Sequence, residues 1–525
     1  MPTAPRWDEK STHSVWKHKL RLLSVWSLML CLACHCVAIA EEADKPSNDQ
    51  PAIVEPAIVE PAVDEPPAVT EPAVDESPIT VQELQAHASF LASDTLQGRE
   101  AGTAGGQAVA AYLSDELRRL KLQPIGTGND YRQPFGAGFQ NVLGLLVGTD
   151  PQLKDEWIVL GAHFDHVGFG NRTNSHGPFG QIHNGADDNA SGVSCLLEIA
   201  EALKGGPPLR RSVAFAFWDG EEKGLLGSEH WLKTHPARSQ IRFYTNLDMV
   251  GRLRDDTVEV FGVRTLPGLR TRLARSNASD LQLKFDWAQR DDSDHHNFYL
   301  RGIPYVMIYT GLHNDYHRPS DDIEKLNIEG MQRVATVVIT HTTHLADHPE
   351  PLVFRDACRY ELSPHTPGTP LLSRLGCTWS PARVRGETIT LSKVEPGLAA
   401  DRAGLKPGDE LLTINGQDVR EVEDFMAWVR QSSQHLEVDL HRADNGAQEH
   451  VSFDLDGFAL PPGATAASDG AEPGIAVLTF VTRASFADLS GFRSGDRIHE
   501  VREGAAPSDR RWQIERGGRL VVLPK

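Results

Sequence analysis

The stretch EWIVLGAHFD, residues 156–165, indicates both the fold and the place of a functional site. Its apolar run shows no polar alternation, which is typical of a strand that is covered on both faces of a sheet. His163 and Asp165 follow at the carboxyl end of that strand, the edge where open α/β sheets usually bind ligands. The stretch therefore predicts a buried strand that leads directly into a binding or catalytic site.

Similar apolar runs alternate with helical patterns from Val81 to about residue 346. This alternation predicts an α/β domain with a three-layer α/β/α arrangement around a mostly parallel mixed sheet. Helices are expected near residues 84–91 and 106–120. The expected strands are residues 141–147, 156–162, 211–218, 242–247, 257–262 and 304–309.

Acidic and histidine side chains follow successive strands of this domain: His163, Asp188, Glu221, Glu222, Asp248 and His317. Taken singly, each has an ordinary explanation as a helix cap, a surface acid pair or a hydrogen-bonded loop histidine. Together they place several acids at one edge of the sheet, where the acids would repel one another without a cation. Zinc binds both imidazole and carboxylate, and a bridging carboxylate can hold two ions about 3.5–4 Å apart. The sequence therefore predicts two Zn²⁺ per catalytic domain.

The order of the motifs closely resembles the co-catalytic zinc aminopeptidases, the bacterial leucyl aminopeptidase and aminopeptidase Y type related to glutamate carboxypeptidase II and the transferrin receptor. The resemblance covers residues 81–346. Its motifs are HFD at residues 163–165, GADDNASG at 185–192, EE at 221–222, NLD at 246–248 and YH at 316–317.

The resemblance implies a role for each ligand. Asp188 would bridge the two ions, with His163 and Asp248 completing one site and Glu222 and His317 completing the other. The implied function is metal-dependent hydrolysis of N-terminal residues from peptides.

Three further residues receive catalytic roles from the resemblance. Glu221 would be the general base that activates water and returns the proton to the leaving amine. Asp165 would orient His163 as a hydrogen-bond acceptor. Tyr316 would polarise the scissile carbonyl, with an ordinary place in the pocket wall as the alternative. Four more histidines are expected to line the pocket without a metal role: His166, His183, His295 and His296.

Two other functions stay open at this point. Glutaminyl cyclases share the fold but use one zinc, and a non-catalytic adaptor carrying PDZ domains would have lost its ligands. All the expected ligands and the base are present, which argues against the adaptor. The residues alone do not separate aminopeptidase from endopeptidase or carboxypeptidase activity.

The N-terminal 80 residues are read as two segments. Residues 1–40 combine basic residues with an apolar run that ends in Ala-Ile-Ala, which predicts a secretory signal peptide. The protein is therefore expected to be exported to the periplasm, the cell envelope or the medium, and to be membrane-bound only if the signal stays uncleaved. Residues 41–80 are rich in proline and acids and predict an extended disordered linker. A net charge of −20 makes nucleic acid an unexpected partner.

The C-terminal region contains a repeat. The pattern ADRAGLKPGD at residues 400–409 returns as ADLSGFRSGD at residues 487–496. After a linker at 347–370, these copies predict a PDZ domain at 371–456 and a shortened second PDZ-like repeat at 457–525.

The first copy resembles a complete bacterial PDZ domain. Residues 374–377 resemble the loop that holds a peptide carboxylate, and residues 422–429 resemble the helix that walls the groove. A C-terminal peptide ligand is expected there, with a spacer that binds nothing as the alternative. Three cysteines remain after the signal, and a bridge from Cys358 to Cys377 is one option.

Overall fold

The computed structural model describes residues 78–361, 369–370, 374–380, 388–419, 429, 435–457, 459–502 and 509–524. The predicted signal peptide at residues 1–40 lies outside the described residues, as do nearly all of the predicted linker at 41–80 and all but Val429 of the predicted groove helix. Within the described part of the chain, no helix is both long and apolar enough to cross a membrane.

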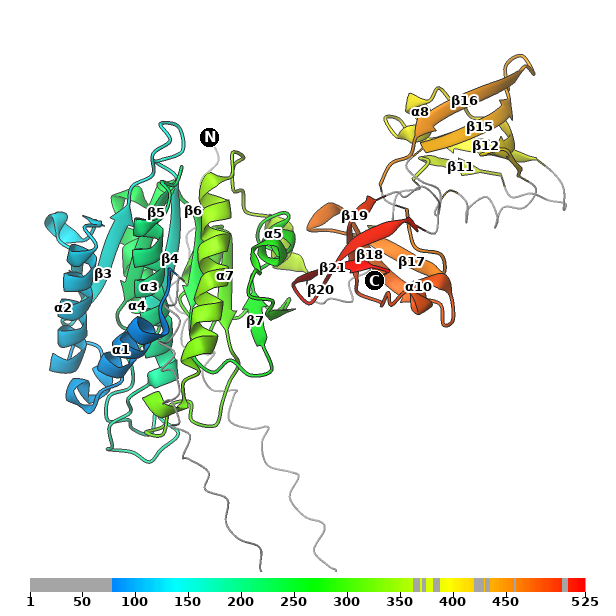
Figure 1. Ribbon diagram of the computed structural model, residues 1–525. Helices are drawn as coiled ribbons and strands as arrows, with labels where there is room; N and C mark the ends of the chain where they lie inside the picture. Colours follow the sequence, from blue (N-terminus) through cyan, green and yellow to red (C-terminus); the bar gives the residue numbers. More distant parts are fainter. Residues whose placement is uncertain are drawn as a thin grey trace, which may run out of the picture. The chain divides into compact units, whose positions relative to one another are not determined.

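A nine-stranded mixed sheet lies at the centre of the first domain, in the order β1-β3-β5-β4-β6-β9-β7-β8, with β2 paired to β3 (Figure 1). The central strands β5, β4, β6 and β9 are parallel, whereas β3 and β7 are antiparallel to their central neighbours. The bounds are β1 Gln123–Pro124, β2 Arg132–Phe135, β3 Phe139–Leu146, β4 Trp157–His163, β5 Ser212–Trp218, β6 Ile241–Leu247, β7 Thr257–Phe261, β8 Gln282–Phe285 and β9 Tyr305–Tyr309.

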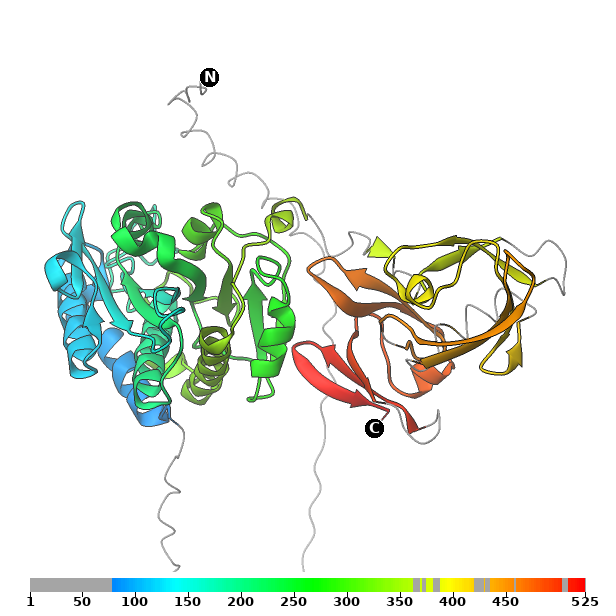
Figure 2. The ribbon, with the colours of Figure 1, turned by 90° about the horizontal axis from the view of Figure 1, so that it is seen from above.

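Helices cover both faces of this sheet, as the view from above shows (Figure 2). Successive side chains of β4 point to opposite faces, so Ile158 and Leu160 join one hydrophobic core and Trp157 and Val159 join the other. Helices α1, α3 and α7 pack on the first core, and α4 and α6 pack on the second. The helices are α1 Val81–Leu91, α2 Ala104–Arg119, α3 Gly192–Gly205, α4 Leu226–Thr234, α5 Leu269–Ser276, α6 His295–Leu300 and α7 Ile328–Asp347.

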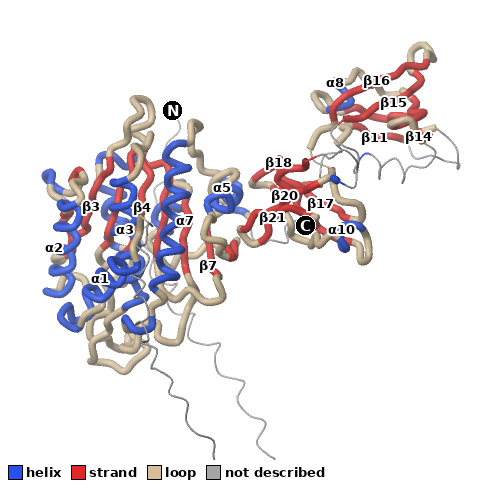
Figure 3. The backbone as a smooth tube through the Cα atoms, viewed as in Figure 1, coloured by secondary structure: helices blue, strands red, loops and turns tan. Residues whose placement is uncertain are grey.

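The predicted three-layer α/β/α domain with a mostly parallel mixed sheet is confirmed, with the strands flanked by helices (Figure 3). Each of the six predicted strands is present. The sequence did not predict β1, β2 or β8. These strands have two to four residues and are only partly buried, so they lack the long apolar run that identifies the central strands.

The C-terminal region contains two further small sheets. The first has the order β11-β12-β13-β15-β16, with β14 paired to β13. Its elements are β11 Cys377–Trp379, β12 Ile389–Val394, α8 Ala399–Arg402, β13 Glu410–Ile414, β14 Gln417–Asp418, β15 His435–His441 and β16 Gln448–Asp454.

The second small sheet has the order β10-β17-β18-β19-β20-β21. Its first strand, β10, comes from residues predicted to be linker: Thr369 pairs with Ser468 and Pro370 with Ala467. The elements are β10 Thr369–Pro370, β17 Ala464–Asp469, β18 Glu472–Val481, α10 Phe486–Leu489, β19 Arg497–Arg502, β20 Arg511–Arg516 and β21 Arg519–Leu523.

The repeated aspartate has the same structural role in both copies. Asp409 accepts a hydrogen bond from the backbone N–H of Lys406 at 2.9 Å, and Asp496 accepts one from Arg493 at 2.8 Å. Each aspartate also pairs with an arginine of a later strand or its end, Arg442 or Arg516. The sequence repeat therefore corresponds to a repeated turn.

The three cysteines of the described region, Cys195, Cys358 and Cys377, are buried and free. The Cys358–Cys377 bridge that the sequence left as an option is not formed. Burial raises the pKa of all three thiols, so they behave as small apolar side chains.

Candidate metal centre

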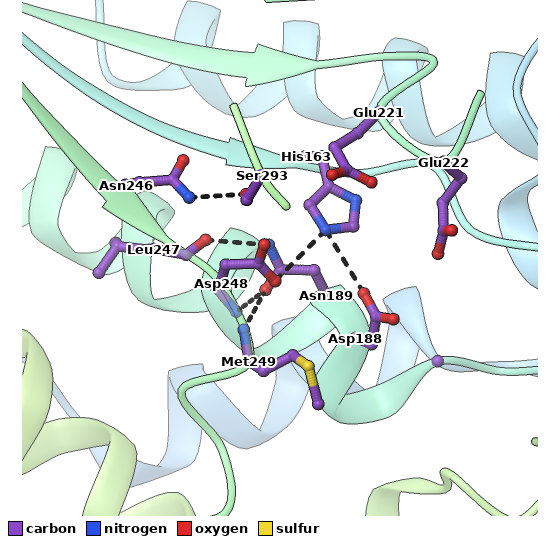
Figure 4. Close-up of polar contacts among 12 residues, drawn as sticks. His163, Asp188, Asn189, Glu221, Glu222, Asn246, Leu247, Asp248, Met249 and Ser293 are labelled. Atoms are coloured by element: carbon purple, nitrogen blue, oxygen red, sulfur yellow. Dashed lines mark hydrogen bonds and ion pairs between the residues drawn. The ribbon is translucent and has the colours of Figure 1, made fainter. Parts of the chain in front are cut away.

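Three of the five predicted ligands, His163, Glu222 and Asp248, lie at the carboxyl ends of the neighbouring parallel strands β4, β5 and β6 (Figure 4). A fourth, His317, lies in the segment that follows the next parallel strand, β9. His163 is the last residue of β4, the pair Glu221 and Glu222 follows β5, and Asp248 follows β6. Asp188 lies in the irregular turn Ala186–Ser191, which leads into α3. Because parallel strands end at the same edge of the sheet, residues far apart in the sequence meet there.

One group of ligand atoms is formed by His163, Asp188 and Asp248. His163 Nε2 lies 3.4 Å from Asp188 Oδ1 and 3.4 Å from Asp248 Oδ1. All three side chains are buried. Two carboxylates that converge on one imidazole nitrogen offer a donor set of the kind that divalent zinc accepts.

A second group shares Asp188 and adds Glu222, His317 and His166. His317 Nε2 lies 3.1 Å from Asp188 Oδ2 and 3.1 Å from Glu222 Oε1. The two oxygens of Asp188 therefore face different histidines, His163 and His317. The structure brings together all five predicted ligands, and His166, which the sequence assigned no metal role, lies among them.

The separations between these atoms fit zinc. Zinc lies about 2.0–2.2 Å from imidazole nitrogen and carboxylate oxygen, so two ligands of a tetrahedral ion are about 3.3 Å apart. The distances of 3.1–3.4 Å that His163 and His317 make to the carboxylates match this value. The donor set of imidazole and carboxylate also suits zinc better than magnesium or calcium, which prefer oxygen alone.

Asp165 supports the site differently from what was predicted. The hydrogen-bond partner of His163 Nδ1 is the backbone carbonyl of Asp165, at 3.1 Å, while the nearest carboxylate oxygen is 3.9 Å away. The Asp165 carboxylate instead accepts the backbone N–H groups of Glu221 at 3.0 Å and Glu222 at 3.3 Å. It therefore fixes the turn that carries the expected base and one ligand.

Glu221 lies beside the His163 ring (Figure 4). Burial raises the pKa of its carboxyl well above the usual value, while His163 opposes the rise. A carboxylate that is poorly solvated takes up a proton more readily, which is what a general base requires.

The backbone of the ligand loops is held by Asn189, beside the bridging residue. Its Nδ2 donates to the carbonyl of Leu247 at 2.9 Å, and its Oδ1 accepts the N–H of Met249 at 3.2 Å (Figure 4). The Asn189 side chain therefore connects the segment that carries Asp188 to the segment that carries Asp248, and it fixes the spacing of these two ligands.

Arg99 is a buried guanidinium beneath the same loops, only 1% exposed. It donates to the carbonyls of Leu91 at 2.7 Å, Phe164 at 2.9 Å, Asn184 at 2.5 Å and Gly185 at 3.0 Å. Phe164 follows His163, and Gly185 opens the turn that carries Asp188. Burial lowers the pKa of Arg99 to about 10, which still leaves it charged at neutral pH. It is a positioning residue that connects two ligand loops.

We expect Arg99→Met to lower the free energy of unfolding by about 3 kcal/mol, because the carbonyls lose their donor while they stay buried. Urea unfolding of the zinc-free protein measures the effect. The matched control is Arg119→Met, whose side chain is 49% exposed, with an expected loss below about 1 kcal/mol. An equal loss in the two variants would contradict the positioning role.

Two more residues that the sequence did not reveal support the bridging turn. Asp321 accepts the backbone N–H groups of Asp187 at 2.9 Å and Asp188 at 3.0 Å. His313 Nε2 lies 3.1 Å from Asp187 Oδ2. The only signal in the sequence was their place on either side of His317.

The other predicted pocket residues have separate roles. The Tyr316 ring stacks on His317, with centroids 3.9 Å apart. His183 and His295 are fully buried, so they do not line an open pocket as expected. His183 Nε2 lies 2.6 Å from Ser175 Oγ, and burial lowers the pKa of His295 to about 3. His296 is half-buried beside Tyr299.

Comparison with known proteins agrees with the motifs. Residues 141–342 match Peptidase family M28, and residues 390–440 match the PDZ domain family. The chain is 31% identical over 213 residues to Aminopeptidase YwaD of Bacillus subtilis, covering 38% of this chain and 43% of that protein. It is 26% identical over 310 residues to the probable leucine aminopeptidase 2 of Aspergillus fumigatus, covering 50% and 58%.

Among solved structures, that of BSAP, a zinc aminopeptidase from Bacillus subtilis, is similar with a TM-score of 0.43 at 19% identity, covering 54% of this chain and 99% of that one. The chain spans about half the length of the two curated relatives. These matches confirm the predicted resemblance to zinc aminopeptidases and the predicted C-terminal PDZ domain.

Proposed function

We propose that this chain is a metallopeptidase that holds two zinc ions and removes N-terminal residues from peptides. The observation that carries the proposal is Asp188, whose two oxygens each lie 3.1–3.4 Å from a different histidine. With zinc bound, one carboxylate placed in this way would hold both ions. The names of the aligned relatives support the choice of an aminopeptidase.

Two bound zinc ions would supply Lewis acidity toward the scissile carbonyl and lower the pKa of water. The protein contributes the proton transfer. Glu221 would take the proton from the attacking water and deliver it to the leaving amine, so that the amine departs neutral. The Asp165 carboxylate would keep Glu221 in place through its backbone N–H.

Tyr316 would donate a hydrogen bond from its hydroxyl to the carbonyl oxygen of the substrate as negative charge develops there. Burial and the nearby carboxylates, Asp188 first among them, raise the pKa of Tyr316. The phenol therefore stays protonated at neutral pH and can act as a donor. Stacking on His317 fixes the direction of the ring.

Purified protein is expected to release nitroaniline from aminoacyl-nitroanilides, to lose this activity with a chelator and to recover it with added zinc. N-acetylated substrates are the matched control and should not be cleaved. A parallel assay for cyclisation of peptides with N-terminal glutamine tests the cyclase alternative. Cleavage of blocked peptides would contradict the aminopeptidase assignment. Cyclisation without hydrolysis would contradict hydrolysis altogether.

We also propose that the first PDZ-like module binds the C-terminus of a peptide. Among the described residues, β11 is the terminal strand of its sheet, and an extended peptide that adds to its outer edge would continue the sheet. The loop before it is held by Arg374, which donates to the carbonyls of Val429 at 3.0 Å and Asp456 at 3.2 Å.

Export of the protein is proposed from the sequence of residues 1–40 alone.

A further inference from the structure

We propose that His166 is a protein ligand of the second zinc ion, which would then be held by four side chains while the first is held by three. The proposal rests on the zinc centre proposed above. It assigns a direct role to a histidine outside the five residues that the motifs identified, and it makes the two metal sites unequal.

The contacts of His166 converge on the second group of ligands. Its side chain is buried, with 1% exposure, and Nδ1 lies 2.9 Å from Glu222 Oε1 and 3.8 Å from Asp188 Oδ2. The ligand atoms of His166, Asp188, Glu222 and His317 all lie within 4.8 Å of one another. The shorter and longer distances bracket the separation of about 3.3 Å between two ligands of a tetrahedral zinc ion.

The ring is held in this orientation by the backbone around it. A Cβ atom at Gly185 would lie 2.5 Å from His166 Cδ2, so the ring fits against bare backbone at the start of the bridging turn. The backbone N–H of His166 donates to the carbonyl of Arg99 at 3.3 Å. Nε2 has no hydrogen-bond partner in the described part of the chain, so the ring makes its polar contacts through Nδ1.

The two imidazoles of the second group have the relation expected of a shared ion. The His166 and His317 rings are 5.5 Å apart between centroids, with an angle of 80° between their planes. Two imidazoles bound to one tetrahedral zinc have centroids about 5 Å apart. A pair packed only for burial has no reason to direct both nitrogen atoms toward the same carboxylate oxygen, Glu222 Oε1.

The unequal ligand sets have a functional consequence. Four protein ligands close a zinc site, whereas three leave a position for water or substrate. The first group has three ligands, and Glu221 lies beside its histidine (Figure 4). With zinc bound, the open position would therefore lie on the ion held by His163, Asp188 and Asp248, next to the base Glu221.

A pair of nearly isosteric variants separates ligation from simple hydrogen bonding. Asp and Asn both place an atom near the position of His166 Nδ1. If His166 is a ligand, His166→Asp restores zinc affinity that His166→Ala loses, and His166→Asn restores less. If His166 only donates a hydrogen bond to Glu222, Asn restores affinity and Asp repels the glutamate. Zinc affinity is measured by competition with a chromophoric chelator.

Counting imidazoles gives a second readout that does not depend on activity. The His163→Ala variant removes the histidine of the first group, and one equivalent of zinc is then added. X-ray absorption should count two imidazoles on that zinc, and one in the His163→Ala, His166→Ala double variant. His176→Ala, which removes an exposed histidine 6.1 Å from His317 between ring centroids, is the matched control and should leave two.

A count of one imidazole in His163→Ala, or no bound zinc, would overturn the proposal. So would an Asn variant that binds zinc as tightly as the Asp variant. For scale, losing a hydrogen-bond partner of a ligand typically costs about 10–100-fold in metal affinity, so a loss above this range is expected for His166→Ala. Peptidase activity of the wild-type protein is assayed separately, so failure of the proposed function is distinguishable from failure of this proposal.

Discussion

Glu221→Gln is expected to lower kcat on aminoacyl-nitroanilides by about 10²–10⁴-fold, the usual contribution of a general base. Glutamine has nearly the same shape as glutamate but cannot accept the proton. The backbone N–H of Glu221 keeps its hydrogen bond to the Asp165 carboxylate, so the turn and the neighbouring ligand Glu222 stay in place. Zinc content per chain, measured by atomic emission, is therefore expected to equal that of the wild type.

The matched control for this prediction is Glu229→Gln. Glu229 is a partly exposed glutamate on α4, where it pairs with Lys233 at 2.6 Å. Removing its charge is expected to leave kcat, KM and zinc content unchanged. Full activity of Glu221→Gln with bound zinc would exclude Glu221 as the base. Loss of zinc would show that Glu221 is needed to hold the metal.

The strands and the five ligands could be predicted because both leave local signals. Residues 157–162 form a short continuous apolar run, which is typical of a strand buried on both faces. His163, Glu222 and Asp248 lie within a few residues of the ends of such strands, so their common edge followed from the topology of parallel strands. Asp188 lies in the turn that leads into α3, and His317 lies in the segment after β9. Zinc chemistry followed from the mixture of histidine and carboxylate in that order.

The supporting residues could not be predicted, because their contacts join distant segments. Arg99 donates to the carbonyls of Phe164 and Gly185, which are 65 and 86 residues away. Asp321 accepts the N–H of Asp188 from 133 residues away. A backbone carbonyl has no residue type, so no motif marks the partner of a buried arginine. The same applies to Asp165, because its carboxylate accepts the backbone N–H groups of Glu221 and Glu222 and makes no hydrogen bond to His163.

His166 shows a different limit of sequence reasoning. It lies three residues after His163. Its spacing from the other motifs matched no ligand position that was still unfilled, so it received no metal role from the sequence. The structure places its Nδ1 beside Glu222 because β4 ends at His163 and the chain then turns toward the strand-end carboxylates. The direction of a side chain after a strand depends on that turn, and a sequence motif does not contain it.

Asp188→Asn is expected to reduce bound zinc from two ions to at most one per chain and to abolish measurable peptidase activity. Asp188 belongs to both groups of ligands, and its oxygens lie 3.4 Å from His163 Nε2 and 3.1 Å from His317 Nε2. An amide keeps the shape but offers one neutral oxygen, so it cannot bridge two cations. The first group then retains only His163 and Asp248 as good ligands, and its ion should be lost first.

Zinc content after dialysis against a weak chelator measures this loss, with Asp155→Asn at an exposed position as the matched control. His163→Ala removes a ligand from the first group only. The variant should therefore retain one zinc ion, with the same affinity as the more tightly bound ion of the wild type. Asp188→Asn should hold its remaining ion more weakly, because both groups lose a charge. Two firmly bound ions in Asp188→Asn would contradict a bridging carboxylate and, with it, the shared centre on which hydrolysis is argued.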